Sequence, residues 1–291
     1  MIRTDLAIEA HEVCGADENA VKCYTEEKCG MKITTMKIED DESAARMGKS
    51  KGTYITMEMP PLAESYRQAD DKIAEIGNII RSLLPEEGTV LVAGIGNSDI
   101  TPDALGPKAA AGVLATRHIS KELARQTGLE KLRSAAVIAP GVLGQTGIET
   151  GELLFSIAKR IKPEAVIVVD ALASRRLERL GCTVQVSDTG ISPGAGVGNH
   201  RLEIDKSTMG VPVISIGVPT VVDALTLASD LLGCPITKEI RKNISPKGQS
   251  MVVTPREVDL LIDRAAKLIG MAVNCALQKD FSVSELSALT S

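Results

Sequence analysis

Four short apolar runs, separated by stretches with helical spacing, constrain the fold of this 291-residue chain most strongly. The runs cover residues 90–95, 135–139, 165–169 and 211–218. Strands that are apolar on both faces are typical of a parallel sheet covered by helices on each side. We expect helices between the runs, at residues 107–117, 149–161 and 222–232. The alternation predicts the α/β fold class, with three α/β/α layers around a mostly parallel sheet.

The chain before and after this alternation has other patterns. Residues 31–59 contain two stretches of period-two alternation, which predict a peripheral antiparallel pair. A single amphipathic helix is expected from residue 69 until Pro85. A closing helix is expected from the cap-like 254–257 stretch to about Leu277. We therefore interpret residues 1–291 as a single α/β domain with a peripheral β-rich substructure at 31–59.

The polar end of the chain, residues 282–291, is expected to be a flexible tail. Aromatic residues make up only 2% of the chain and the net charge is −5, so a nucleic-acid partner is not expected. No segment reaches 18 consecutive apolar residues, and the N-terminus lacks the apolar core of a secretory signal. The sequence thus predicts a cytoplasmic protein without a membrane partner.

Six cysteines are scattered along the chain without a paired Cys-x-x-Cys spacing, which is typical of reduced thiols. They are Cys14, Cys23, Cys29, Cys182, Cys234 and Cys275. The first three lie near His11, but their spacing does not match the usual zinc patterns. We therefore predict no metal site there.

The first candidate site lies in residues 94–107, between an expected strand and an expected helix. Loops at the carboxyl ends of parallel strands are where α/β folds place their sites. Gly94 and Gly96 suggest a dinucleotide loop, but that motif requires glycine at position 99, where Asp99 stands. Asp103 is the candidate that remains, with a helix cap or turn as its structural alternative.

Asp170 follows directly on the apolar run 165–169. A charge held against such a strand costs free energy unless it is paired or used in chemistry. The structural alternative is that Asp170 marks the strand exit and accepts backbone N–H groups. Because Asp103 is expected at the same edge of the sheet, we favour a functional interpretation of both.

A glycine-dense loop at residues 187–199 is the third candidate. Its exposed N–H groups can hold a substrate backbone or an oxyanion, although positive φ angles alone would also explain the glycines. Asp188-Thr189-Gly190 matches the triplet of pepsin-like proteases by chance, because those all-β enzymes carry two copies. Nucleophile motifs are missing: the chain has no Gly-x-Ser-x-Gly, and neither His118 nor His200 is paired with Ser or Cys by its context.

Seven stretches in this order resemble the germination protease family of spore-forming bacteria. They are Arg3-Thr4-Asp5-Leu6-Ala7, Gly94-Ile95-Gly96-Asn97, Thr101-Pro102-Asp103-Ala104-Leu105-Gly106-Pro107, Val169-Asp170-Ala171-Leu172-Ala173-Ser174, Ser187-Asp188-Thr189-Gly190, Pro193-Gly194-Ala195-Gly196-Val197-Gly198-Asn199 and Val253-Thr254-Pro255. The resemblance runs from residue 3 to about residue 270.

The resemblance implies a homotetrameric endopeptidase, made as a zymogen, that degrades small acid-soluble spore proteins in the cytoplasm of the spore core during germination. It implies an atypical aspartic mechanism in which the catalytic residues match Asp103 and Asp170, without a cofactor. It also implies a fold similar to that of hydrogenase maturation proteases. We further expect the 193–199 loop to line the substrate cleft. Its predicted substrate-binding residues are Gly194, Gly196, Gly198 and Asn199.

Two carboxylates that face each other suit peptide hydrolysis, because the ionised one can activate water while the protonated one donates to the carbonyl oxygen. One alternative is a nickel-dependent hydrogenase-maturation-type endopeptidase, with Asp103, Asp170 and His200 as candidate ligands. Another is a non-enzymatic α/β module whose glycine loops bind an anion or nucleotide.

A prosegment usually precedes the 3–7 stretch in the family, whereas here only Met1 and Ile2 precede it. Two interpretations stay open: the sequence is written in mature form, or its inhibition does not depend on a removable N-terminal piece.

Overall fold

A mixed sheet forms the centre of the molecule. The computed structural model describes residues 4–14, 21–63, 69–194, 202–233 and 251–290. Within them the strand order is β1-β2-β3-β7-β8-β6-β4-β5, and β9 pairs with β8. The parallel strands are β4 (Val90–Gly94), β5 (Ala135–Ile138), β6 (Ala165–Ser174) and β8 (Val213–Asp223). These are the four runs predicted as strands, and the predicted α/β fold class is confirmed.

Antiparallel strands extend this parallel centre. They are β1 (Val21–Lys28), β2 (Met31–Ile38), β3 (Gly52–Glu58), β7 (Thr183–Ser187) and β9 (Val252–Val253). The two strands within residues 31–59 pair with each other, and β3 then pairs with β7 in the register Tyr54↔Ser187. Residues 31–59 thus continue the central sheet.

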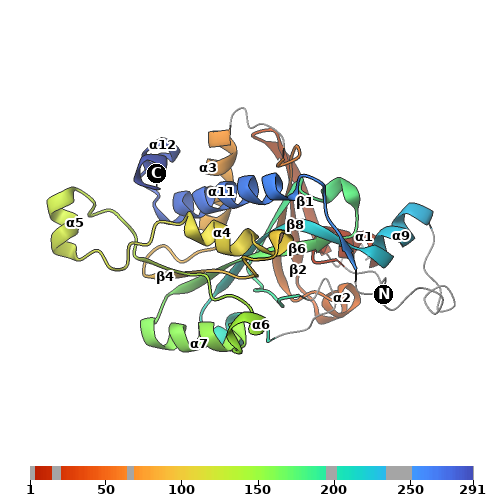
Figure 1. Ribbon diagram of the computed structural model, residues 1–291, viewed down its shortest axis with the longest axis horizontal. Helices are drawn as coiled ribbons and strands as arrows, with labels where there is room; N and C mark the ends of the chain where they lie inside the picture. Colours follow the sequence, from red (N-terminus) through yellow and green to blue (C-terminus); the bar gives the residue numbers. More distant parts are fainter. Residues whose placement is uncertain (1–3, 15–20, 64–68, 195–201, 234–250, 291) are drawn as a thin grey trace.

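Helices cover both faces of the sheet (Figure 1). One face carries α3 (Ala69–Ser82), α4 (Leu105–Ala111), α11 (Val258–Leu277) and α12 (Val283–Thr290). The other carries α6 (Leu143–Thr146), α7 (Thr150–Ile161), α8 (Lys206–Met209), α1 (Ala7–Cys14) and α2 (Asp41–Met47). In β4, Val90 and Val92 pack toward the first face and Leu91 toward the second, so both faces of this strand are buried. This two-sided burial is why the strands are apolar without alternation.

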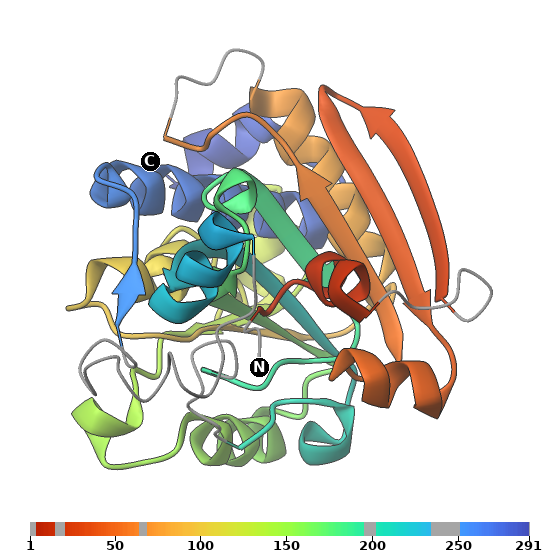
Figure 2. The same cartoon turned by 90° about the vertical axis from the view of Figure 1, so that its right-hand side faces the viewer.

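Two further helices lie toward the ends of the molecule (Figure 1). They are α5 (Lys121–Thr127) and α9 (Ala224–Leu232). Short 3-10 turns, η1 (Thr101–Asp103) and η2 (Leu177–Arg179), complete the described elements. Figure 2 shows α1, in red, in front of the sheet.

The C-terminal part differs from the sequence prediction in two places. The closing helix ends at Leu277 as expected but begins at Val258, because Thr254 donates its hydroxyl to the carbonyl oxygen of Thr220 (2.9 Å) and does not cap the helix. The expected flexible tail at 282–291 instead contains α12. Its Leu286 is fully buried against the core, and the Glu285 carboxylate accepts the Ser282 N–H (2.7 Å) at the start of the helix.

Candidate active site

Asp170 lies within β6, opposite Gly217 of β8. The strand does not end at this residue, as the sequence suggested, but continues to Ser174. The side chain is only 6% exposed, and its Oδ1 accepts the N–H of Ala171 (2.9 Å). A carboxyl group therefore stands inside a buried strand.

The surroundings of Asp170 favour its neutral form. Burial raises its pKa well above the usual value, and the negative charges of Asp103 and Asp5 raise it further, against the N–H of Ala171. Desolvation and like charges both disfavour an ionised carboxylate. The structure thus brings Asp103 and Asp170 together, as their expected positions at one sheet edge suggested. Their catalytic roles stay a prediction.

Asp103 ends the η1 turn that follows β4. Its Oδ2 accepts the backbone N–H of Asn97 (2.8 Å). The carbonyl oxygen of the preceding Pro102 accepts the hydroxyl of Thr220 on β8 (2.7 Å). The turn that carries Asp103 is thereby attached to the strand next to Asp170.

Two glycines allow this turn to fold back on the end of β4. Gly96 has a φ of +121°, and a Cβ there would overlap the carbonyl oxygen of Asp103. Gly106, at the start of α4, packs against the carbonyl oxygens of Ile95 and Val169, where a Cβ has no room. The Gly-x-Gly of this loop therefore serves a close backbone approach.

Asp99, the neighbouring carboxylate in the same loop, makes hydrogen bonds that stabilise the loop. It is exposed, and its Oδ2 accepts an N–H of the Gln145 side chain (3.1 Å), which also donates to Asn97 (2.7 Å). These contacts tie the loop to α6.

A third carboxylate, Asp5, joins the pair, and the sequence analysis did not select it as a site residue. Its N–H donates to the carbonyl oxygen of Ala173, and its Oδ2 accepts the N–H of Ala173, each at 2.8 Å. The negative charge of Asp5 raises the pKa of Asp170. The sequence feature that could have identified Asp5 is its place in the Arg3-Thr4-Asp5-Leu6-Ala7 stretch. Its contact with β6 could not be predicted, because the two segments are far apart in the sequence.

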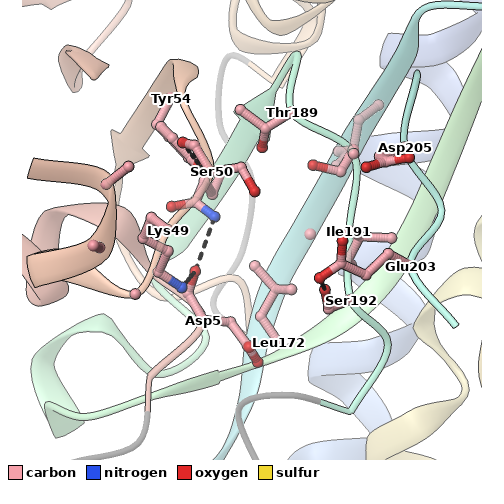
Figure 3. Close-up of a pocket in the computed structure, with 18 residues that line it drawn as sticks. Asp5, Lys49, Ser50, Tyr54, Leu172, Thr189, Ile191, Ser192, Glu203 and Asp205 are labelled. Carbon is pink, nitrogen blue, oxygen red and sulfur yellow. Dashed lines mark hydrogen bonds between the residues drawn. The ribbon is translucent and has the colours of Figure 1, made fainter. Parts of the chain in front are cut away.

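A cavity of about 410 Å³ opens beside Asp5 (Figure 3). Asp5 and Leu172 belong to its wall, and Leu172 lies two positions after Asp170 on the same face of β6. In Figure 3, Lys49 and Tyr54 lie on one side of the cavity and Glu203 on the opposite side. Neither Asp103 nor Asp170 is among the described residues that line it. Asp5 and Leu172 are thus the wall residues that lie next to the site of Asp103 and Asp170.

The glycine-dense loop is described only in part. Gly190 and Gly194 have positive φ angles of 77° and 74°, as the structural alternative for this loop required. Gly196, Gly198 and Asn199, three of the predicted substrate-binding residues, lie outside the described residues. Asp188 accepts the N–H of Thr53 (2.7 Å), so this carboxylate joins the loop to β3.

The metal and thiol predictions concern other residues. Among the residues that the structure describes, no group of three His, Cys, Asp or Glu side chains is arranged to hold a metal ion. His200, a candidate nickel ligand, and Cys234 lie outside them. The five described cysteines form no disulfide with one another. Within the same residues, no helix combines the length and apolar character needed to cross a membrane.

The fold and the site define an α/β protein in which a buried acid on a parallel strand, Asp170, lies near two half-buried acids, Asp103 and Asp5. Residues 4–236 match the model of the germination protease family. The germination protease of Caldanaerobacter subterraneus subsp. tengcongensis is 44% identical over 317 residues, covering 99% of this chain and 98% of the relative. That of Priestia megaterium is 33% identical over 360 residues, covering 99% and 97%. The chain belongs to the germination protease family, and the family indicates a protease.

Among solved structures, a [NiFe] hydrogenase maturation protease, HycI from Thermococcus kodakarensis, is similar over 67% of this chain and 98% of its own. The TM-score is 0.37 and the sequence identity 18%. At this TM-score the likeness carries no argument about the site.

Proposed function

We propose that this protein is an endopeptidase that degrades small acid-soluble spore proteins during germination, with Asp103 and Asp170 activating water. Family membership supports the protease activity and its setting in germination. The observation that carries the mechanism is the burial of Asp170 beside the charge of Asp103. A zymogen, a homotetramer and a location in the spore core belong to the same proposal.

The two carboxyl groups take opposite parts in hydrolysis. Asp103, whose carboxylate accepts the Asn97 N–H, takes a proton from water as the water oxygen attacks the peptide carbonyl carbon. Asp170, kept neutral by burial and like charges, donates its proton to the carbonyl oxygen. When the tetrahedral intermediate collapses, the C–N bond breaks, the amine takes the proton held by Asp103, and the carbonyl oxygen returns its proton to Asp170.

The cavity beside Leu172 provides room for substrate residues next to the cleaved bond. Its volume of about 410 Å³ suits a few side chains. The 193–199 loop follows directly on Ser192, which belongs to the cavity wall. Its N–H groups, at Gly194, Gly196, Gly198 and Asn199, would hold the substrate backbone.

Cleavage of a purified small acid-soluble spore protein tests the proposal. Asp103→Asn and Asp170→Asn should each lower kcat/KM by about 10³-fold or more, since each removes one proton-transfer group. Circular dichroism should show both variants folded. Asp99→Asn is the matched control in the same loop and should keep full activity. Turnover by both variants at the wild-type rate would refute the assignment, and activity abolished by a chelator and restored by nickel would favour the metal-assisted alternative.

A further inference from the structure

The N-terminal segment approaches the site from a distant part of the sequence. Asp5 forms two hydrogen bonds with Ala173, one through its backbone and one through its carboxylate, each at 2.8 Å. Ala173 is three residues beyond Asp170 on β6. The Asp5 carboxylate therefore provides the hydrogen-bond acceptor for the buried Ala173 N–H at this end of the strand.

Buried polar side chains hold Asp5 in this place. Lys49 donates its ammonium group to the carbonyl oxygens of Thr4 (3.1 Å) and Asp5 (2.9 Å). Gln185 of β7 donates to the carbonyl oxygen of Asp5 (3.2 Å) and accepts the N–H of Ala7 (2.7 Å). Both side chains line the cavity with Asp5 (Figure 3). These bonds hold the backbone around Asp5, while Ala173 of β6 holds its carboxylate.

A second anchor holds the segment further along. Glu9, which is fully buried, accepts the N–H groups of Arg175 (2.6 Å) and Arg176 (3.0 Å), just after β6. The same carboxylate accepts the hydroxyl of Thr4. The segment is therefore attached to β6 at Asp5 and to the residues just after β6 at Glu9, and its position relative to Asp170 is constrained.

Within the described part of the chain, the two acids whose charges act on Asp170 come from different segments. Asp103 faces it from the η1 turn and Asp5 from the N-terminal segment, both with negative charge. Lys49 faces Asp5 and Glu9, and burial lowers the pKa of Lys49 against the effect of these two acids. A carboxylate beside a buried acid makes loss of the acid's proton less favourable.

We propose that Asp5 is a positioning residue of the active site, which fixes the end of β6 and keeps the proton on Asp170. The inference rests on the proposed function, because it assigns Asp170 the role of the acid. Lys49 moderates the effect, because its ammonium group lies beside Asp5 and interacts with its charge. The N-terminal segment thereby contributes a positioning residue to the active site.

The pH dependence of kcat/KM tests the inference, with a small acid-soluble spore protein as substrate. The alkaline limb of the profile reports loss of the proton from Asp170. Asp5→Asn keeps an oxygen that can accept the Ala173 N–H but removes the charge, so the limb should move to lower pH by about one unit. Asp40→Asn is the matched control, because Asp40 caps α2, accepts the Ser43 N–H, and Asn caps equally well. Its limb should not move.

A second variant gives the opposite sign. Lys49→Gln keeps a donor for the two carbonyl oxygens but removes the positive charge, so the alkaline limb should move to higher pH. A purely structural role for Asp5 would lower activity at all pH values without moving either limb. If Asp5→Asn does not fold, the shift in Lys49→Gln decides the question.

The outcomes separate this inference from the proposed function. If Asp103→Asn and Asp170→Asn are inactive while the limbs of Asp5→Asn and Lys49→Gln coincide with that of the wild type, only the role of Asp5 is overturned. If Asp103→Asn and Asp170→Asn remain active, the catalytic assignment itself is wrong.

Discussion

Two groups of carboxylates, each with one buried member, differ in their partners: Glu9 is buried in the first and Asp170 in the second. Around Arg179, the acids Glu9, Glu12 and Glu58 share one guanidinium group at distances of 3.5, 2.5 and 3.1 Å. Although burial opposes it, the hydrogen bond and charge of Glu12, with the charges of Glu58 and Glu9, raise the pKa of Arg179 above its usual value. In the second group, Asp170 faces two other acids.

The charge of the partners separates structural from functional acids in this fold. A buried carboxylate with a cation and backbone N–H partners is stabilised as an ion and holds elements together. A buried carboxylate with acidic neighbours lowers stability and is retained where a shifted pKa serves chemistry. Both groups are joined by the N-terminal segment, which carries Glu9 and Asp5. Loss of the first group is therefore expected to affect folding, and loss of the second to affect catalysis.

The largest expected effect on stability is that of Arg179→Met. This change leaves three carboxylates without their shared cation, and the free energy of unfolding should fall by about 3–5 kcal/mol in urea denaturation. Arg176→Met is the control, because its side chain is 45% exposed and contacts Glu12 at 3.4 Å. It should cost about 1 kcal/mol or less. Equal losses in both variants would contradict the special role of the Arg179 group.

The pH dependence of stability should have opposite signs in the two groups. The pKa of Asp170 is raised, so its folded form binds the proton more tightly than the unfolded chain. The stability of the wild type relative to Asp170→Asn should therefore fall by about 1.4 kcal/mol per pH unit above about pH 4, until the raised pKa is passed.

Glu12 should behave in the reverse way. Burial opposes the shift, but the hydrogen bond and charge of Arg179 lower the pKa of Glu12. The stability of the wild type relative to Glu12→Gln should thus be full above the usual glutamate pKa and be lost as the pH falls below it. Urea denaturation at several pH values measures both differences. If the two stability differences changed with pH in the same direction, the proposed distinction between the two groups of acids would be contradicted.

A smaller effect is expected at Thr220, which connects the η1 turn to β8. Thr220→Val removes the hydrogen bond to the Pro102 carbonyl oxygen and should lower the free energy of unfolding by about 1 kcal/mol. Because the turn carries Asp103, kcat should also fall several-fold while KM changes little. Thr127→Val, on exposed α5, is the control and should leave kcat unchanged. An unchanged kcat in Thr220→Val would show that this attachment does not position Asp103.

The parallel part of the fold was predictable because burial on both faces leaves an unambiguous pattern. The runs at 90–95 and 165–169 were identified as strands for this reason. Asp170 was selected because it directly follows such a run, and Asp103 because it lies in the loop after another run and matches the catalytic stretch of the family. The continuation of β6 beyond Asp170 was missed, since the carboxylate itself interrupts the apolar run that marks a strand.

Contacts between distant segments were not predictable in the same way. Asp5 and Ala173 of β6 are 168 positions apart in the sequence, and the local sequence around Asp5 does not predict their hydrogen bond. The helix at 283–290 was missed because a single buried residue, Leu286, attaches it to the core. Such elements are specified by tertiary packing, for which a local pattern gives no signal.

The protonation state of Asp170 tests the account most directly. Carbon-13 NMR of protein labelled at aspartate carboxyl carbons can follow each group with pH, and the Asp170→Asn variant identifies the resonance of Asp170. Because the pKa of Asp170 is raised, this resonance should keep the chemical shift of a neutral carboxyl group at pH values where aspartates with the usual pKa are ionised. An Asp170 resonance that titrates near pH 4 with the others would contradict the proposed division between acid and base.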